Sequence, residues 1–156
     1  MIYNLDYKFP KQVLLNEYNK LFDKKMEIKS PTEEFSGFWL LFSTDVTQRI
    51  AKDFIEYYNI PYDQYIVNFL YIEPNAVLPW HIDQERSMCA INCILTDKPT
   101  AIQFEDGEYV YDTALVDVKS KHKVVNNDNP RILYRITFQN EDATFEKVKN
   151  ILCQKS

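Results

Sequence analysis

The segment from residue 65 to residue 139 contains short runs of β-branched and aromatic residues, separated by turn-forming residues. The runs cover 65–72, 88–95, 100–104, 108–111, 114–118, 121–125 and 131–139. Turn signals such as Asp106-Gly107 lie between them. Runs of this length and composition predict β-strands, and so many in succession predict a double-sheet sandwich or barrel.

Helical periodicity flanks the predicted strands on both sides. The spacing of apolar residues predicts helices over 10–22, 44–58 and 143–152, and a short strand over 38–42. Either Thr44 or Asp45 can cap the second helix. Two helices followed by about seven short strands predict a mainly β (α+β) fold. We expect a jelly roll with the N-terminal helices packed on one outer face and a C-terminal helix at the end.

The last predicted strand, 131–139, has two chemically different faces. One face carries Ile132, Tyr134, Ile136 and Phe138, and the other carries Arg131, Leu133, Arg135 and Thr137. The apolar face is suited to lie under helices, which leaves the other face inside the barrel. Two arginines on an inward face are costly unless an anion or acid meets them, so this face predicts a binding site.

Length and charge limit the remaining possibilities. With 156 residues, we expect one domain over 1–156, with helical support over 1–60, a β-barrel core over 61–140 and a C-terminal helix over 141–156. The two glycines are too few for a phosphate-cradling loop. A net charge of −5 argues against nucleic acid as the main partner.

The cysteines and the first residues bear on the compartment. Cys89 and Cys93 fall in an apolar run, where cysteine most often behaves as a small buried hydrophobe. With Cys153 they form no CxxC pair, which suits a reducing cytoplasm. No signal peptide or membrane span is visible in the first ten residues, so we expect a cytoplasmic protein with no membrane partner.

The two histidines of the sequence, together with one aspartate, predict a metal site. His81 and Asp83 are two positions apart, so in an extended segment both side chains point the same way and can bind one ion. His122 lies in the penultimate predicted strand. Two imidazoles and one carboxylate form the facial triad of non-haem Fe(II) oxygenases. An HxD tripeptide by itself is common, and a lone strand histidine is usually structural; the combination of all three favours the metal.

An inward arginine adds to this pattern, because 2-oxoglutarate carries a distal carboxylate that needs a desolvated, preferably bidentate partner inside a barrel. Arg131 follows His122 by nine residues and Arg135 follows it by thirteen. Either arginine can serve as that partner.

Residues 65–138, about half of the chain, resemble the double-stranded β-helix core of the 2-oxoglutarate/Fe(II)-dependent dioxygenases. The likeness is greatest to the small aspartyl/asparaginyl- and prolyl-hydroxylase-like members. It rests on the segments that begin at His81, His122 and Arg131, which read HID, HKVVN and RILY. The resemblance implies Fe(II) bound by His81, Asp83 and His122. It also implies 2-oxoglutarate as cosubstrate, with its far carboxylate on Arg131 and Arg135 as the alternative. Aspartyl β-hydroxylase itself lacks the carboxylate ligand that Asp83 supplies here, so no substrate is carried over.

Two further residues are candidates for cosubstrate binding. Tyr71 lies ten residues before His81, where some prolyl hydroxylases place a tyrosine against the cosubstrate; a core tyrosine is an equally good interpretation. Asn92 is polar within an apolar run, so it is expected to face a group that needs hydrogen bonds. The resemblance places Asn92 near the cosubstrate.

Together, these patterns predict an Fe(II)- and 2-oxoglutarate-dependent oxygenase that uses O2 to hydroxylate a C–H bond. The substrate would be an amino acid, a peptide or protein side chain, or a small metabolite. The alternatives are a non-catalytic cupin-like metal-binding domain and a structural jelly roll. The cupin-like alternative has no need for a buried arginine on the last strand.

Overall fold

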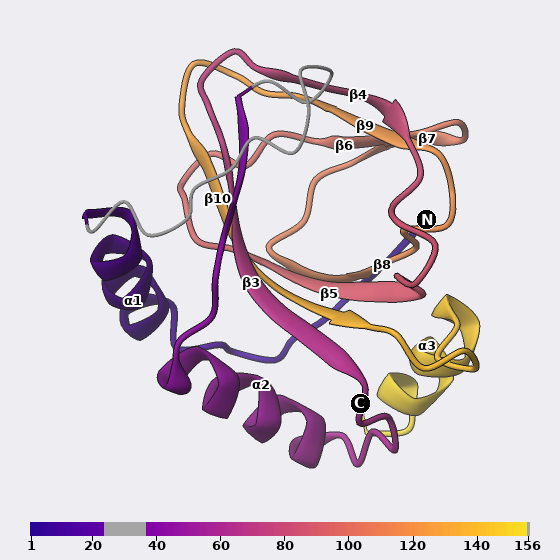
Figure 1. Ribbon diagram of the computed structural model, residues 1–156. Helices are drawn as coiled ribbons and strands as arrows, with labels where there is room; N and C mark the ends of the chain where they lie inside the picture. The colour runs from indigo at the N-terminus through magenta and orange to yellow at the C-terminus, as the bar shows by residue number, and fades with distance from the viewer. Residues whose placement is uncertain (24–36, 156) are drawn as a thin grey trace.

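The computed structural model describes residues 1–23 and 37–155, whose strands form two facing antiparallel sheets (Figure 1). The strands are β1 (Ile2–Asn4), β2 (Phe38–Leu41), β3 (Tyr65–Ile72), β4 (Val77–His81), β5 (Cys89–Ile94), β6 (Ile102–Phe104), β7 (Gly107–Tyr109), β8 (Thr113–Val116), β9 (His122–Val125) and β10 (Arg131–Phe138). The helices are α1 (Lys11–Asp23), α2 (Asp45–Tyr57) and α3 (Phe145–Cys153). The fold is the predicted mainly β jelly roll.

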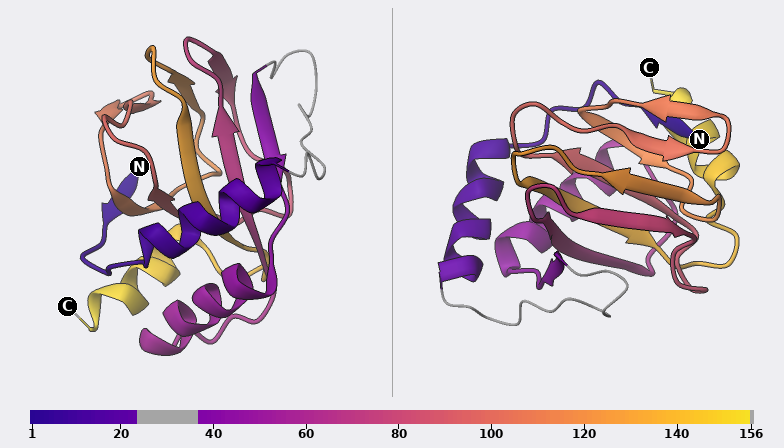
Figure 2. Two further views of the ribbon diagram at one scale, coloured as in Figure 1. Left: turned by 90° about the vertical axis from the view of Figure 1, so that its left-hand side faces the viewer. Right: turned by 90° about the horizontal axis from the view of Figure 1, so that it is seen from above.

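The larger sheet has six strands in the order β1-β8-β5-β10-β3-β2, and the smaller has four in the order β4-β9-β6-β7. Strand β10 is central, because it pairs along its length with β3 and with β5. Figure 2 shows the two sheets stacked against each other from two further directions.

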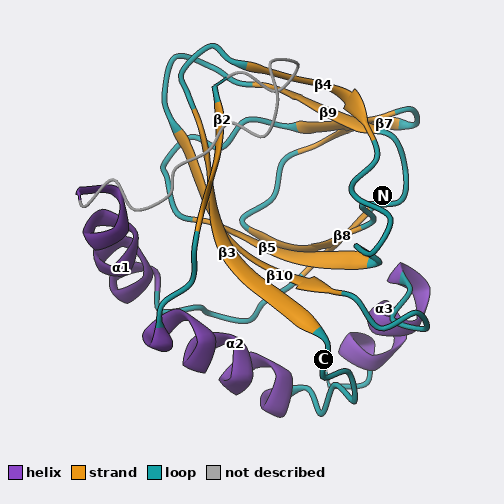
Figure 3. Cartoon of the chain, viewed as in Figure 1, coloured by secondary structure: helices purple, strands orange, loops and turns teal. Residues whose placement is uncertain are grey.

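All three helices lie against the outer face of the six-stranded sheet; in Figure 3, α2 is below the barrel, α1 is at the left and α3 is at the lower right. The apolar layer between helices and sheet contains Phe54 of α2, Phe69 of β3 and Tyr134 of β10, each almost fully buried. A second apolar layer, with Leu70 and Leu133, lies between the two sheets. The six-stranded sheet is therefore buried on both faces. Among the described residues, no helix is long and apolar enough to cross a membrane.

Strand β10 confirms the predicted alternation. Ile132, Tyr134, Ile136 and Phe138 lie in the layer under the helices. Arg131, Leu133, Arg135 and Thr137 line a cavity between the sheets. The barrel interior is thus charged at two positions of its central strand.

Helix α2 begins where a capping residue was expected. Thr44 is the N-cap: its hydroxyl accepts from the backbone N–H of Thr47, and the Thr47 hydroxyl accepts from that of Thr44. The apolar stripe that the sequence predicts is Val46, Ile50, Phe54 and Tyr57 or Tyr58, and the buried face is slightly rotated from it. Ile55 is buried, whereas Val46 and Tyr57 are exposed.

Two strands were not predicted, β1 and β4. Strand β4 contains Pro79, which weakens the strand signal of the sequence. A proline is tolerated here because β4 is the edge strand of its sheet, where one side of the backbone needs no partner. His81 is therefore the last residue of β4.

Candidate metal and cosubstrate site

The metal-ligand candidates lie on two neighbouring strands of the smaller sheet. Strands β4 and β9 are antiparallel, and their register places His81 directly opposite His122. The two imidazole rings are 4.3 Å apart between centroids. Asp83 follows β4 by two residues, and its backbone N–H donates to the carbonyl of Val118 at 3.1 Å. Residues far apart in the chain are thereby brought to one end of the cavity.

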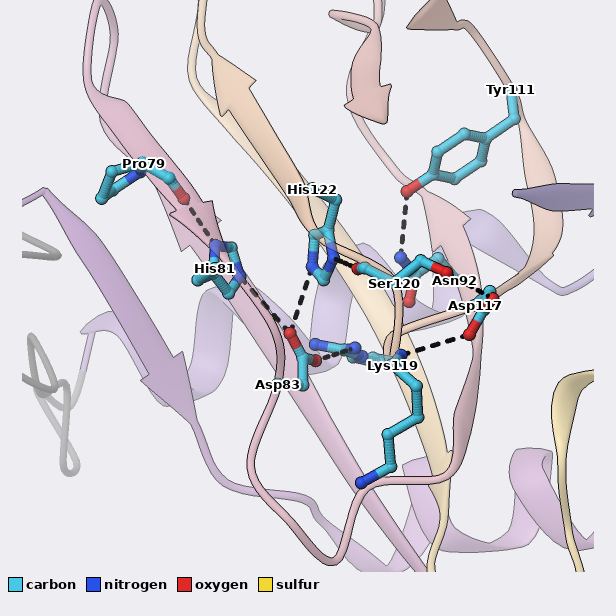
Figure 4. A network of polar contacts seen from close by, with 10 residues as sticks. Pro79, His81, Asp83, Asn92, Tyr111, Asp117, Lys119, Ser120 and His122 are labelled. Carbon is cyan, nitrogen blue, oxygen red and sulfur yellow. Dashed lines mark hydrogen bonds and ion pairs between the residues drawn. The ribbon is translucent and has the colours of Figure 1, made fainter. Parts of the chain in front are cut away.

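Backbone carbonyls orient both imidazoles. Nδ1 of His81 lies 2.6 Å from the carbonyl oxygen of Pro79, and Nδ1 of His122 lies 2.7 Å from that of Ser120 (Figure 4). When Nδ1–H donates to these carbonyls, Nε2 is the nitrogen that faces Asp83, where it carries a proton or binds a metal. This hydrogen-bond pattern is the usual way in which a protein fixes the tautomer of a metal-binding histidine.

The turn before β9 is itself held by a carboxylate. Asp117 accepts from the backbone N–H of Lys119 at 3.2 Å and from the hydroxyl of Ser120 at 2.7 Å (Figure 4). These bonds fix the Ser120 carbonyl that orients His122. Sequence reasoning did not identify this supporting role of Asp117.

The three candidate ligand atoms have the spacing of a metal site. Oδ1 of Asp83 is 3.3 Å from Nε2 of His81 and 3.1 Å from Nε2 of His122. All three atoms lie within 4.8 Å of one another. Metal–ligand bonds of about 2.1 Å at right angles place neighbouring ligand atoms about 3.0 Å apart. The two carboxylate–imidazole distances therefore fit neighbouring ligands of an octahedrally coordinated divalent cation.

The charges of the site favour a cation as well. Burial acts to raise the pKa of Asp83, but the Arg135 charge and hydrogen bonds from both histidines hold it well below its usual value. Burial acts to lower the pKa of His81, but the hydrogen bonds to Asp83 and Pro79 raise it overall. An ionised carboxylate that faces two imidazoles attracts a positive ion, either a proton or a metal.

Arg131, Asn92 and Tyr111 form a second polar group in the same cavity. The guanidinium of Arg131 is almost fully buried and donates to the Thr100 carbonyl and, at 3.1 Å, to the Tyr111 hydroxyl. The side-chain amide of Asn92 donates to the same hydroxyl at 2.9 Å (Figure 4). Both Arg131 and Asn92 thus lie where the sequence placed them, inside the barrel.

The sequence did not identify Tyr111 as a site residue, and Tyr71, which it did identify, does not lie at the cavity. Tyr111 follows β7 in an irregular segment, where strand alternation gives no direction for its side chain. Tyr71 is on the helix-facing side of β3, with its ring 5.8 Å from that of Phe22. The structure does not bring Tyr71 to the cavity.

The second inward arginine, Arg135, is directly bonded to a ligand candidate. Its Nη2 donates to Oδ2 of Asp83, the oxygen that does not face the histidines. The cavity that contains these groups has a volume of about 310 Å³. Its walls are otherwise largely apolar, with Ile72, Leu78 and Leu133 among them. A small polar ligand can be held there away from bulk water.

The sequence matches no protein-family model, and no curated protein matches it significantly. Its fold, however, matches solved structures. A prolyl hydroxylase from Trichoplax adhaerens, in complex with a peptide of hypoxia-inducible factor, superimposes with a TM-score of 0.69 at 10% identity, over 100% of this chain and 86% of that one. A prolyl-4-hydroxylase from Pseudomonas putida gives 0.63 at 12% identity, over 90% of this chain and 92% of that one.

HygX from Streptomyces hygroscopicus, solved with nickel, 2-oxoglutarate and hygromycin B, gives a TM-score of 0.61 at 8% identity. The match covers 92% of this chain and 84% of HygX. At such identities the likeness concerns the fold. This chain shares the jelly-roll fold of these prolyl hydroxylases and of HygX.

Proposed function

We propose that this protein is an Fe(II)- and 2-oxoglutarate-dependent oxygenase that hydroxylates a C–H bond of an amino acid, a peptide side chain or a small metabolite. One observation carries the proposal. The ligand atoms of His81, Asp83 and His122 lie within 4.8 Å of one another in a cavity that also contains the buried guanidinium of Arg131.

In this proposal, His81 and His122 hold the iron through Nε2 and Asp83 holds it through Oδ1. The carbonyls of Pro79 and Ser120 keep both imidazoles in the tautomer that binds. When bound, iron and 2-oxoglutarate supply the oxidising chemistry by which O2, 2-oxoglutarate and a C–H bond become succinate, CO2 and an alcohol. The protein supplies ligand geometry, a desolvated cavity and orientation of the reactants.

Arg131 is the better partner for the far carboxylate of the cosubstrate. It is four residues along β10 from Arg135, which is bonded to the ligand candidate Asp83. A dicarboxylate that chelates a metal with one end needs its second partner some distance away, and Arg131 meets that need. The Tyr111 hydroxyl beside Arg131 accepts two hydrogen bonds, so its own proton is free to be donated to the carboxylate.

Anaerobic addition of Fe(II) and 2-oxoglutarate tests the proposal. We expect a weak visible absorption band, and succinate release once O2 and a substrate are added. We also expect Mn(II) to raise the melting temperature, because a ligand that binds the folded state stabilises it.

The variants His122→Ala and Asp83→Asn should abolish the absorption band, the succinate release and the Mn(II) effect. Asp53→Asn, which removes the same charge from the exposed side of α2, should abolish none. Intact protein that gives neither band nor succinate contradicts the proposal.

The variant Arg131→Gln distinguishes an oxygenase from a cupin-like domain that only binds metal. In the oxygenase we expect the 2-oxoglutarate requirement to rise by about 10- to 100-fold, since a buried charged hydrogen-bond donor is lost. The Mn(II) effect on the melting temperature should persist. If the 2-oxoglutarate requirement is unchanged in Arg131→Gln and rises in Arg135→Gln, the cosubstrate role belongs to Arg135. Metal binding with no 2-oxoglutarate effect in the wild-type protein indicates the cupin-like alternative.

A further inference from the structure

Arg135 is a largely buried charge that the proposed function does not require. Its side chain is only 14% exposed and lines the cavity beside Asp83. On the neighbouring strands, the residues opposite Arg135 are Asn68 of β3 and Asn92 of β5. One row across the floor of the cavity therefore reads Asn68, Arg135, Asn92, next to the ligand candidates.

The charges of the site balance without Arg135. Neutral histidines, ionised Asp83, a divalent metal, doubly charged 2-oxoglutarate and Arg131 together carry no net charge. Among the described residues that line the cavity, Arg135 is the remaining charged side chain. It leaves one positive charge unbalanced in a largely apolar enclosure, and such a charge is costly unless an anion meets it.

Hydrogen-bonding capacity also remains in this row. Nη2 of Arg135 donates to Asp83, but Nε of Arg135 is buried without a hydrogen-bond partner in the described part of the chain. Oδ1 of Asn68 and Oδ1 of Asn92 are also buried without a hydrogen-bond partner in that part of the chain. A planar guanidinium can donate to one carboxylate from one nitrogen and to a second carboxylate from the other nitrogens. The two amide oxygens can accept from an N–H or O–H group next to that second carboxylate.

One part of the cavity rim is apolar and exposed. Leu40, Ile66 and Ile82 all line the cavity, yet they are 36%, 46% and 57% exposed. Leu40 is on β2, Ile66 is on β3, and Ile82 lies between His81 and Asp83. A substrate that enters past them has apolar surface to cover them.

We propose that Arg135 binds a carboxylate of the substrate, so that the substrate is a small acid with an apolar part and an N–H or O–H donor beside the carboxylate. An apolar α-amino acid, free or at the end of a peptide chain, has this chemistry. The carboxylate lies against Arg135, the donor faces Asn68, and the apolar part contacts Leu40, Ile66 and Ile82. This inference rests on the proposed function, because the site is the proposed active site.

Matched acids and amides test the inference by calorimetry. The wild-type protein, with Mn(II) and the unreactive cosubstrate analogue N-oxalylglycine, is titrated with leucine, isoleucine and phenylalanine and with their N-acetyl forms. Each acid is compared with its carboxamide. We expect the acids to bind about 10- to 100-fold more tightly than the amides, the range for a charged hydrogen-bonded pair. Tighter binding of the N-acetyl acids indicates a chain end, and tighter binding of the free amino acids indicates a free acid.

Variants assign the effect to Arg135. Arg135→Gln should remove the preference for acids, and Arg135→Lys should restore part of it, because lysine keeps the charge and loses the fork. Arg49→Gln removes the same charge from the exposed side of α2 and should leave the preference intact. Amides that bind as tightly as acids, no binding by any acid, or an acid preference that survives in Arg135→Gln overturns the inference.

The two proposals fail separately. If the Fe(II)–2-oxoglutarate band forms and no acid binds, the oxygenase proposal stands and the carboxylate site is wrong. If the band is absent but the acids bind through Arg135, the carboxylate site stands and the oxygenase proposal is wrong.

Discussion

At the scale of single residues, Tyr111 shows how one hydroxyl can organise a binding site. The hydroxyl accepts from Arg131 at 3.1 Å and from Asn92 at 2.9 Å, and the Arg131 guanidinium lies 5.6 Å from the Tyr111 ring centroid. These contacts hold three side chains from different segments in one arrangement. In the proposed enzyme, this group forms the end of the cavity that receives the far carboxylate of the cosubstrate.

Removing this hydroxyl should therefore affect the cosubstrate and leave the metal unaffected. In Tyr111→Phe, Arg131 and Asn92 each lose an acceptor, and we expect the 2-oxoglutarate requirement to rise by about 10-fold. The Mn(II) shift in melting temperature should match that of the wild type. Tyr109→Phe is the control, because its hydroxyl bonds Asp106 at 2.9 Å and lies outside the cavity lining. A normal 2-oxoglutarate requirement in Tyr111→Phe would remove Tyr111 from the cosubstrate site.

At the scale of elements, a buried carboxylate joins α1 to α2. Glu17 of α1 is only 6% exposed; it accepts from Lys20 at 2.8 Å and from the N-cap hydroxyl of Thr44 at 2.9 Å. The hydrogen bonds from Lys20 and Thr44 lower the pKa of Glu17. The same Thr44 caps α2, so one network links the middle of α1 to the N-terminus of α2.

This network predicts a pH-dependent stability. Because the pKa of Glu17 is lower in the folded protein than in the unfolded chain, its carboxylate stabilises the fold above the unfolded pKa of about 4.3, and this contribution is lost as the pH falls through the folded pKa. Glu17→Gln should lower the free energy of unfolding at pH 7 by about 1 to 2 kcal/mol. The difference from wild type should shrink below about pH 4.

Urea denaturation at pH 7 and at pH 3.5 measures this difference in the free energy of unfolding. The control is Glu56→Gln on α2, whose carboxylate is exposed and lies 3.9 Å from Lys52, so we expect a change of less than about 0.5 kcal/mol. A difference between Glu17→Gln and wild type that is the same at pH 7 and pH 3.5 would contradict the role of the ionised carboxylate.

At the scale of the whole molecule, burial on both faces of the six-stranded sheet controls thiol chemistry. Cys89 and Cys93 on β5 are fully buried, and burial raises the pKa of Cys89 to about 12 and that of Cys93 to about 11. Both thiols therefore stay protonated and inaccessible in the folded protein. Cys153, at the end of α3, is exposed.

We expect one thiol of the native protein to react rapidly with Ellman's reagent at pH 8, and all three to react after unfolding in guanidinium. Cys153→Ser should remove the rapid phase and leave two thiols that react only after unfolding. Rapid reaction of Cys89 or Cys93 in the native protein would show that the sheet opens readily.

The sequence by itself determined which residues share a face within each element. The alternation over 131–139 correctly separated Arg131 and Arg135 from the apolar face under the helices. The two-residue spacing of His81 and Asp83 likewise gave both the same direction. These are local properties, because the geometry of a strand repeats every two residues whatever it packs against.

Only the tertiary structure decided which faces and which strands meet. Tyr71 has the composition and spacing of a site residue, but β3 turns its side chain toward the helices and turns Asn68 into the cavity. The opposition of His81 to His122 and the bond from Arg135 to Asp83 depend on strand register and on sheet packing. Long-range pairing fixes these contacts, and it leaves no periodic signal in the sequence because partner strands are separated by loops of variable length.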